Sequence, residues 1–201
     1  MGLAPTSHTD VLRETATALE DARVAYVVFG SIATRALGRE RPFETGEDID
    51  ILVRPPDVSP ALRALDEAGF VVIEHDPAWI HKAKRSGVTV DVIFRAGGDL
   101  HLDEEMLDRA VPAAVNGVTV PLIPPEDLGV IKAVLHNEQR TFDWFDALAI
   151  VSREDVDWDY LVRRARRHGA RRVLALLLYA KADGAAVPQA AIADLLRATG
   201  T

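Results

Sequence analysis

The spacing of apolar residues changes along the chain near residue 123. Before this point, short apolar runs typical of buried strands alternate with segments of helical spacing. This part predicts helices at 9–22, 32–37 and 57–68, strands at 25–29, 48–53, 70–74 and 88–94, and a strand pair at 113–122. The later part predicts helices at 125–137, 141–151, 155–168, 170–182 and 188–198. We therefore expect an α+β lobe over residues 1–123, with a mixed sheet flanked by helices, and a helical lobe over residues 124–201.

Turn and cap residues support several of these boundaries. Asn116 and Gly117 form a dipeptide that is strongly favoured in two-residue hairpin turns, which predicts an antiparallel strand pair around them. Thr9 or Asp10 is the expected N-cap of the first helix, because either side chain can accept a hydrogen bond from the first turn. A polar loop predicted at residues 39–47 separates the short helix from the second strand.

Two aspartates share one face of the predicted strand at residues 48–53. Side chains alternate across a strand, so Asp48 and Asp50 point to one face while Ile49 and Ile51 point to the other. Neighbouring like charges repel each other, and aspartate is depleted in strands. A divalent cation bound by carboxylate oxygens would offset this cost. A solvated strand start is the alternative interpretation of the pair taken alone.

A third aspartate, Asp91, lies in the predicted strand at 88–94, where its neighbours are largely apolar. An isolated buried carboxylate is costly unless it is paired or bound to metal, so a salt bridge to an arginine or a helix-end contact is the alternative here. Three strand-borne carboxylates together suit a two-metal site for phosphoryl transfer. Asp48, Asp50 and Asp91 are therefore predicted to bind two Mg²⁺ ions, for which Mn²⁺ could substitute. Asp91 is placed to accept the proton of the attacking hydroxyl.

Gly30 and Ser31 follow a buried strand and open a predicted helix. Backbone N–H groups at a helix N-terminus can bind a phosphate, which makes both residues candidates for nucleotide binding. A Gly-Ser pair by itself is more typical of an ordinary turn. Its weight comes from its place upstream of Asp48 and Asp50, in the order strand, turn, helix, strand.

These residues together resemble the nucleotidyltransferase superfamily that includes kanamycin nucleotidyltransferase and DNA polymerase beta. The likeness lies in the Gly30–Ser31 pair, in Asp48 and Asp50 on the next strand, and in Asp91 on a later strand. It implies a nucleotidyltransferase-type mixed sheet, a C-terminal helical lobe, and Mg²⁺-dependent transfer of a nucleoside monophosphate from a nucleoside triphosphate (NTP). Glu47 departs from the pattern, because a serine or threonine often precedes the first aspartate.

The downstream half is similar to the AbiEii/MenT-type toxins of bacterial toxin–antitoxin systems. Residues 125–132 and 142–148 carry this likeness, and the resemblance as a whole spans roughly residues 24–180. It implies transfer of a nucleotide, typically a pyrimidine, to the 3′ end of tRNA, which blocks translation, and it implies a cognate antitoxin as partner. By the same resemblance, Lys132 contacts the triphosphate. Asp146, with Asp143 as the alternative, lies near the nucleotide or Lys132, so Lys132 and Asp146 are candidate catalytic residues.

Charge is unevenly distributed along the 201 residues. The formal net charge of −8 argues against a protein that coats nucleic acid indiscriminately. Residues 1–152 carry 14 Lys and Arg against 25 Asp and Glu, whereas residues 153–201 carry 9 against 6. A predicted helix in the second part holds four arginines that are candidates for RNA binding, Arg163, Arg164, Arg166 and Arg167. A solvated helix face that pairs with nearby acids is the alternative.

Other features bear on location and on competing functions. The chain has no cysteine, no apolar run long enough to span a bilayer, and no basic and apolar leader at its start. We therefore expect a cytoplasmic protein without a membrane partner. Antibiotic-modifying or protein-modifying nucleotidyltransferases are the enzymatic alternatives. A non-catalytic nucleotide-binding module is less favoured, because all three aspartates are present.

Overall fold

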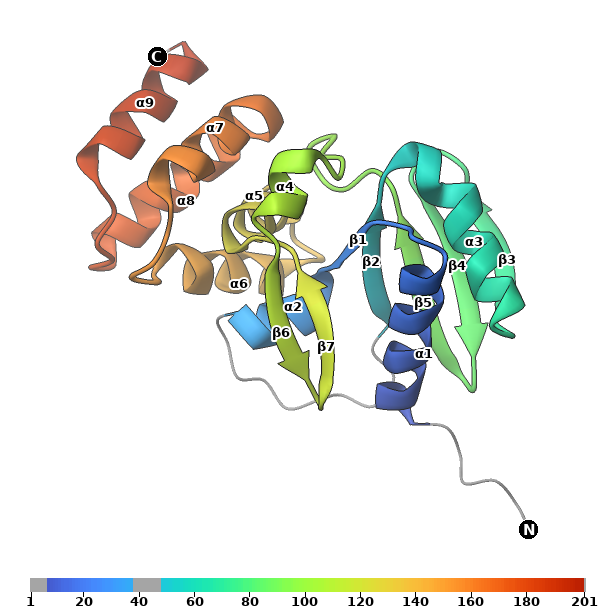
Figure 1. Cartoon of the computed structure of the whole chain (residues 1–201). Coiled ribbons are helices and arrows are strands. Elements are labelled where there is room, and N and C mark those ends of the chain that lie inside the picture. The colour runs from blue at the N-terminus through green and yellow to red at the C-terminus, as the bar shows by residue number, and fades with distance from the viewer. Residues whose placement is uncertain (1–6, 38–47, 201) are drawn as a thin grey trace. The chain divides into compact units, whose positions relative to one another are not determined.

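The computed structural model describes residues 7–37 and 48–200, so the loop predicted at residues 39–47 lies outside the described residues. Two compact units make up this part of the chain (Figure 1). The first contains residues 7–36, 48–96 and 101–123, and the second contains residues 37, 97–100 and 124–200.

The described part of the first unit contains a seven-stranded mixed sheet. Its strands are β1 (Tyr26–Val28), β2 (Ile49–Val53), β3 (Val71–Asp76), β4 (Ile80–Arg85), β5 (Val88–Ile93), β6 (Val111–Val115) and β7 (Val118–Leu122). They lie in the order β3-β4-β5-β2-β1-β7-β6. β2 pairs in parallel with β5 and antiparallel with β1, so these strands bring distant parts of the sequence side by side.

Helices pack against one face of this sheet. α1 (His8–Asp21) and α3 (Val58–Glu67) contact each other and β5, as Figure 1 shows in front of the strands. Arg85 of β4 marks this face, because it forms an ion pair with Glu14 of α1. Ala83 and the register partners Val90 and Ile49 lie on the same face and are fully buried.

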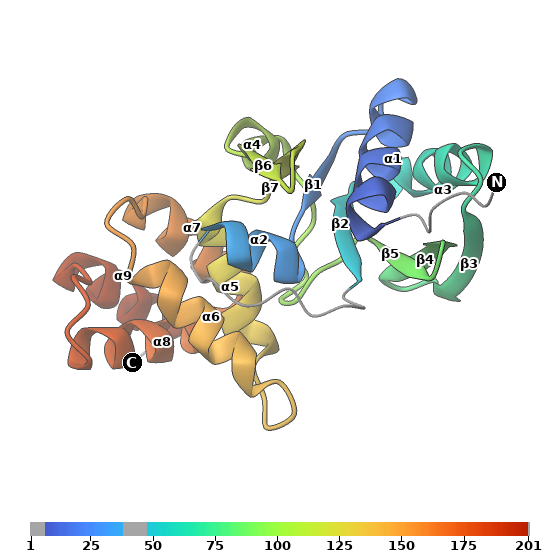
Figure 2. The ribbon, with the colours of Figure 1, turned by 90° about the horizontal axis from the view of Figure 1, so that it is seen from below.

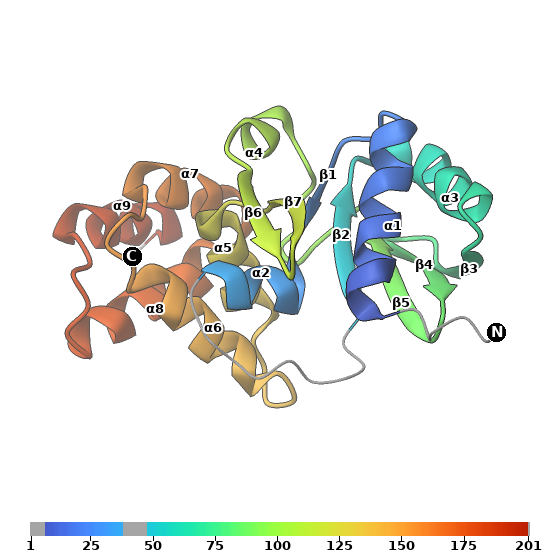
Figure 3. The same ribbon diagram turned by 60° about the horizontal axis from the view of Figure 1, so that its bottom comes forward.

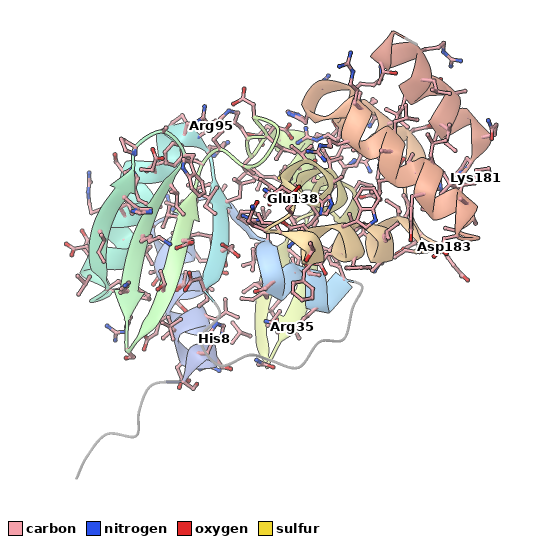
Figure 4. All side chains as sticks on the ribbon, turned by 180° about the vertical axis from the view of Figure 1, so that it is seen from behind. His8, Arg35, Arg95, Glu138, Lys181 and Asp183 are labelled. Carbon is pink, nitrogen blue, oxygen red and sulfur yellow. The ribbon has the colours of Figure 1, made fainter. Side chains whose placement is uncertain are left out.

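The opposite face of the sheet carries the predicted aspartates. Side chains alternate across a strand, so Asp50 of β2, Asp91 of β5 and Lys82 of β4 point away from α1 and α3. We call this surface the carboxylate face. The view from behind in Figure 4 shows these strands in front of α1. Three short elements complete the unit, α2 (Gly30–Leu37), the 3-10 turn Pro55–Asp57 and α4 (Glu104–Asp108).

The second unit is helical. It consists of α5 (Pro125–Leu135), α6 (Thr141–Val151), α7 (Trp158–His168), α8 (Ala170–Ala182) and α9 (Gln189–Thr199). α5 packs against α6, α7 and α8, and α9 packs against α7 and α8 (Figures 2 and 3). Their buried aliphatic side chains, such as Val130, Leu161, Leu176 and Leu195, form one core. None of the helices in the described ranges combines the length and apolar character needed to cross a lipid bilayer.

A buried polar cluster joins α5 to α7. The Asp127 carboxylate is fully buried, and it accepts hydrogen bonds from the Tyr160 hydroxyl and from Arg164 Nε, each at 2.5 Å. Glu126 accepts a hydrogen bond from the backbone N–H of Asp157 at 2.8 Å, just before α7 begins. These contacts fix the register of the two helices, because a buried charge left without its partner is costly.

The predicted fold class is confirmed, with a mixed sheet flanked by helices and helices downstream. Four details differ. The strand β4 and the short helix α4 were not predicted, and α7 begins at Trp158 instead of residue 155. The N-cap of α1 is Ser7, and Asp10 is its N3 partner in a capping box, so the assignment of Thr9 or Asp10 as N-cap was wrong.

Candidate active site

Two of the predicted aspartates are direct neighbours across the sheet. Asp50 and Asp91 are register partners on the parallel strands β2 and β5, and neighbouring strands lie about 4.8 Å apart. Asp48 immediately precedes β2 and lies two residues from Asp50, so alternation directs it to the same face. The fold therefore brings together the strand residues that the sequence marked at positions 48, 50 and 91.

The predicted Gly-Ser turn lies against the same carboxylates. Gly30 begins α2 with a φ of +64°, a backbone conformation that favours glycine. A Cβ at this position would lie 1.9 Å from Oδ2 of Asp50, so a larger residue would force the Asp50 carboxylate to move. The N–H of Phe29 also donates to the Asp50 carbonyl at 3.0 Å. Gly30 is therefore required where the helix N-terminus and the carboxylate meet, and Ser31 lies in the first turn beside it.

Asp91 has a cationic partner in the adjacent strand. Lys82 is its register partner on β4, and Lys82 Nζ lies 2.7 Å from Asp91 Oδ1. The Asp91 side chain is 11% exposed and that of Lys82 is 23% exposed, so the pair is largely shielded from water. A salt bridge was the alternative considered for Asp91, although with an arginine. The structure provides one with a lysine.

The second unit holds a separate cluster around Lys132. Its Nζ lies 2.7 Å from Asp143 Oδ1 and 3.2 Å from Asp146 Oδ2. Arg140 Nε lies 2.7 Å from the other oxygen of Asp143. Burial alone would raise the pKa of Asp143, but the hydrogen bonds and charges of Lys132 and Arg140 outweigh it and hold this pKa below its ordinary value. Proximity of Asp146 to Lys132 agrees with one part of the sequence interpretation, and the nucleotide contact of Lys132 stays a prediction.

The predicted RNA-binding arginines divide into two groups. Arg163, Arg166 and Arg167 are exposed on α7, and Arg163 stacks over the Tyr160 ring at 5.5 Å. Arg164 is 1% exposed and bound to Asp127, so its inclusion in an RNA-binding surface was wrong. A buried guanidinium that is paired with a carboxylate cannot reach a phosphate in solvent, and losing either partner would leave an uncompensated buried charge.

Comparison with known proteins decides the family. The model of a family described as uncharacterised nucleotidyltransferase, NTP_transf_5, matches residues 3–183. The chain belongs to this nucleotidyltransferase family. It is an enzyme that transfers a nucleoside monophosphate. No curated protein sequence matches the chain.

Solved structures share the fold of this nucleotidyltransferase. The antibiotic-resistance factor ANT(2″)-Ia matches with a TM-score of 0.54 at 14% identity, over 91% of this chain and 96% of that chain. An antigenic nucleotidyltransferase-like protein from Paracoccidioides brasiliensis matches with a TM-score of 0.54 at 16% identity, over 97% and 95%. The lincosamide antibiotic adenylyltransferase LnuA matches with a TM-score of 0.50 at 16% identity, over 73% and 99%. Such low identities show a common fold and leave the acceptor open.

The donor chemistry of the nucleotidyltransferase site fits a divalent cation. Carboxylate oxygens are ligands that Mg²⁺ prefers, and Asp50 and Asp91 lie side by side on the neighbouring strands β2 and β5. The ammonium of Lys82 on Asp91 shows that this position attracts positive charge. Within residues 7–37 and 48–200, no three histidine, aspartate or glutamate side chains are already gathered as ligands of one ion.

Two structural features escaped the sequence interpretation. Lys82 was missed because its strand was missed. A signal existed in the dipeptide Ser86–Gly87, where both residues have positive φ and form the tight turn between β4 and β5. The pairing of Asp127 with Arg164 had no local signal, because 37 residues separate the two side chains.

Proposed function

We propose that this nucleotidyltransferase transfers a nucleoside monophosphate, typically a pyrimidine nucleotide, from an NTP to the 3′ end of tRNA. It would thereby block translation as the toxin of a toxin–antitoxin pair in the cytoplasm, with a cognate antitoxin as partner. The transfer chemistry is supported by the neighbouring Asp50 and Asp91 beside the Gly30 turn. The choice of a polynucleotide acceptor is supported by the exposed arginines of the helical unit.

The reaction replaces one phosphorus–oxygen bond with another. The 3′ hydroxyl oxygen of the acceptor attacks the α-phosphorus of the NTP, and the bond from that phosphorus to the bridging oxygen breaks, which releases pyrophosphate. When bound, Mg²⁺ neutralises triphosphate charge and lowers the pKa of the attacking hydroxyl. Asp48, Asp50 and Asp91 would hold the ions. Asp91 would also accept the hydroxyl proton, as its place beside Asp50 allows.

The start of α2 suits the phosphates of the donor. The first N–H groups of a helix have no partner within the helix, and they carry partial positive charge. Gly30 and Ser31 present these groups next to Asp50, and the absent side chain of Gly30 leaves the backbone accessible there. In the helical unit, Lys132 contacts two carboxylates among the described residues, and we propose that the third donor of its ammonium binds an anionic ligand.

The acceptor is inferred from the distribution of arginine. Residues of α7 and of the first turn of α8 form an exposed basic stretch, which we call the arginine stretch, consisting of Arg163, Arg166, Arg167, Arg171 and Arg172. A protein with a net charge of −8 does not attract polyanions as a whole, so a local basic stretch is needed to hold one. A small antibiotic acceptor needs no such stretch.

An antibiotic-modifying activity is the second candidate. The observation that favours it is the likeness in fold to LnuA, a lincosamide antibiotic adenylyltransferase, and to the resistance factor ANT(2″)-Ia. Under this alternative, a small cationic or neutral antibiotic takes the nucleotide and the arginine stretch is not used. Modification of a protein acceptor is a third outcome to be distinguished in the same assay.

Transfer of label identifies donor and acceptor in one experiment. Each of the four NTPs, labelled at the α-phosphate, is incubated with the enzyme, Mg²⁺ and total bacterial tRNA, with Asp48→Ala as the inactive control. We expect label on tRNA from a pyrimidine NTP with the wild type and none with the variant. If tRNA stays unlabelled while a lincosamide, an aminoglycoside or a protein is labelled, the acceptor assignment is wrong and the alternative holds.

A further inference from the structure

Three side chains form a row across the carboxylate face. Lys82, Asp91 and Asp50 occupy matching register positions on β4, β5 and β2. The two carboxylates repel each other, and Asp91 is only 8% exposed as a residue, so water offsets little of this repulsion. Lys82 supplies a counter-charge at the outer end of the row, at 2.7 Å from Asp91 Oδ1.

A divalent ion and the Lys82 ammonium would compete for the Asp91 carboxylate. Mg²⁺ binds carboxylate oxygens at about 2.1 Å and tolerates little distortion of its ligand shell. An ion bound between Asp50 and Asp91 would therefore lie within a few ångströms of an ammonium that stayed on Asp91, and the two cations would repel strongly. Lysine has a flexible stem, and the Lys82 side chain is 23% exposed, so it can leave Asp91 without unfolding β4.

We propose that Lys82 is a tethered cation that holds Asp91 in the metal-free enzyme and competes with the divalent ion for this carboxylate. Lys82 thereby sets the metal concentration at which the site is filled. It is a positioning residue, because it acts on the reaction through Asp91. The inference rests on the proposed metal-dependent activity. It assigns control of metal affinity to Lys82 of β4, the strand next to β5.

Direct metal binding tests the proposal without an activity assay. The dissociation constant of Mn²⁺ is measured by electron paramagnetic resonance for the full-length wild type, Lys82→Gln, Lys82→Arg and Asp50→Asn. Glutamine can still donate a hydrogen bond to Asp91 but carries no charge. We expect Lys82→Gln to bind Mn²⁺ about tenfold more tightly than the wild type, because the competing charge is gone. Lys82→Arg keeps the charge and should stay within about threefold of the wild type.

Lys84→Gln provides the matched control. Lys84 lies two residues along β4 on the same face, opposite Thr89, and is exposed. The same change in net charge at this position should alter the Mn²⁺ dissociation constant by less than about twofold, because solvent and salt screen it. A comparable gain in affinity with Lys84→Gln would show a general charge effect and overturn the proposal.

Thermal unfolding gives a second readout. In EDTA, Lys82→Gln should unfold at a lower temperature than the wild type, because Asp91 loses its cationic partner. Saturating Mn²⁺ should raise the unfolding temperature more for this variant than for the wild type. If the wild type and Lys82→Gln bind Mn²⁺ equally well while Asp50→Asn loses Mn²⁺ binding, the role of Lys82 is overturned and the metal site itself stands. Absence of Mn²⁺ binding in every protein would overturn the proposed metal-dependent function as well.

Discussion

At the scale of single residues, the contact between Gly30 and Asp50 joins two parts of the proposed active site. The two residues are far apart in sequence, yet the Gly30 backbone and the Asp50 carboxylate approach so closely that no Cβ fits between them. Glycine here meets two requirements at once, a positive φ and an unobstructed approach. The effect of positive φ and the effect of the close approach can be separated by comparing a substitution at Gly30 with the same substitution at another glycine of positive φ.

We predict that Gly30→Ala lowers kcat/KM for nucleotide transfer by about 100-fold or more, because the added methyl group displaces Asp50 from its position. Gly117→Ala is the matched control, since Gly117 has a φ of +78° but no atom within 4 Å of an added Cβ. Gly117→Ala should lose about 1 kcal/mol of stability from backbone strain alone, and Gly30→Ala should lose more, because its methyl group also meets the Asp50 carboxylate. Steady-state kinetics and chemical denaturation of the two proteins measure the difference. Equal activity in both would contradict the proposed role of this turn.

A second prediction concerns the carboxylate of Asp143 in the Lys132 cluster. Its folded-state pKa lies below the ordinary value of 3.8, so its contribution to stability is complete above that pH and is lost as pH falls through the folded-state pKa. Asp143→Asn should therefore be less stable than the wild type by about 2 kcal/mol at pH 7. This gap should close as pH falls below 3.8, where the wild-type carboxylate becomes protonated. Urea denaturation of both proteins between pH 2.5 and 7 measures the gap, and a constant gap would refute the assignment.

Sequence alone was enough to single out the aspartates and the Gly-Ser turn as candidate site residues. The aspartates stand out by their alternation within predicted strands, and the turn stands out by its place in the order strand, turn, helix, strand. Sequence could not locate the partner of Asp91. Lys82 reaches this carboxylate through the register of β4 against β5, and that pairing is a property of the folded sheet. The same reason explains the error at Arg164. Burial of one arginine among four depends on a carboxylate from another helix.

At the scale of elements, the strands that were predicted and the one that was missed differ in how they are buried. β7 alternates regularly, with Val118, Val120 and Leu122 buried, and a favourable turn precedes it. In β4, only Ile80 and Ala83 are buried, and they lie on opposite faces. A strand of this kind shows no period-two pattern of apolar residues, so only its turn could have indicated it.

Helix α7 allows a direct test of buried against exposed arginine. We predict that Arg164→Met destabilises the protein by about 3 kcal/mol. The buried Asp127 carboxylate would lose its positive partner and keep only the hydrogen bond from the Tyr160 hydroxyl. Arg166→Met on the same helix should change stability by less than about 0.5 kcal/mol, since this side chain is exposed. Chemical denaturation of both variants gives the comparison. A small effect at Arg164 would show that the cluster does not hold α5 to α7.

At the scale of the whole molecule, charge is separated between the acidic N-terminal part and the arginine stretch. We predict that combined replacement of Arg163, Arg166 and Arg167 with Glu abolishes labelling of tRNA and leaves NTP binding unchanged. Arg164 is excluded from this variant because its loss would disturb the core. The exposed Arg197 of α9, changed to Glu, shows the effect of a charge reversal outside the arginine stretch.

Filter binding at several salt concentrations measures the affinity for tRNA, and calorimetric titration measures the affinity for NTP. The triple variant should also show a shallower dependence of RNA affinity on salt than the wild type, because fewer phosphates are neutralised. Labelling of tRNA at the wild-type rate by the triple variant would show that the arginine stretch does not bind the acceptor.

The parallel pairing of β2 with β5 has a consequence for the order in which the enzyme matures. β4 and β5 are joined by two residues and can pair early, whereas β5 reaches β2 only after the whole segment between them has closed into a loop. From the cost of loop closure we expect Asp91 to reach Asp50 late in folding, with Lys82 already beside it. A chain that is still being synthesised or only partly folded lacks the assembled carboxylates, so we expect it to transfer no nucleotide until the sheet is complete.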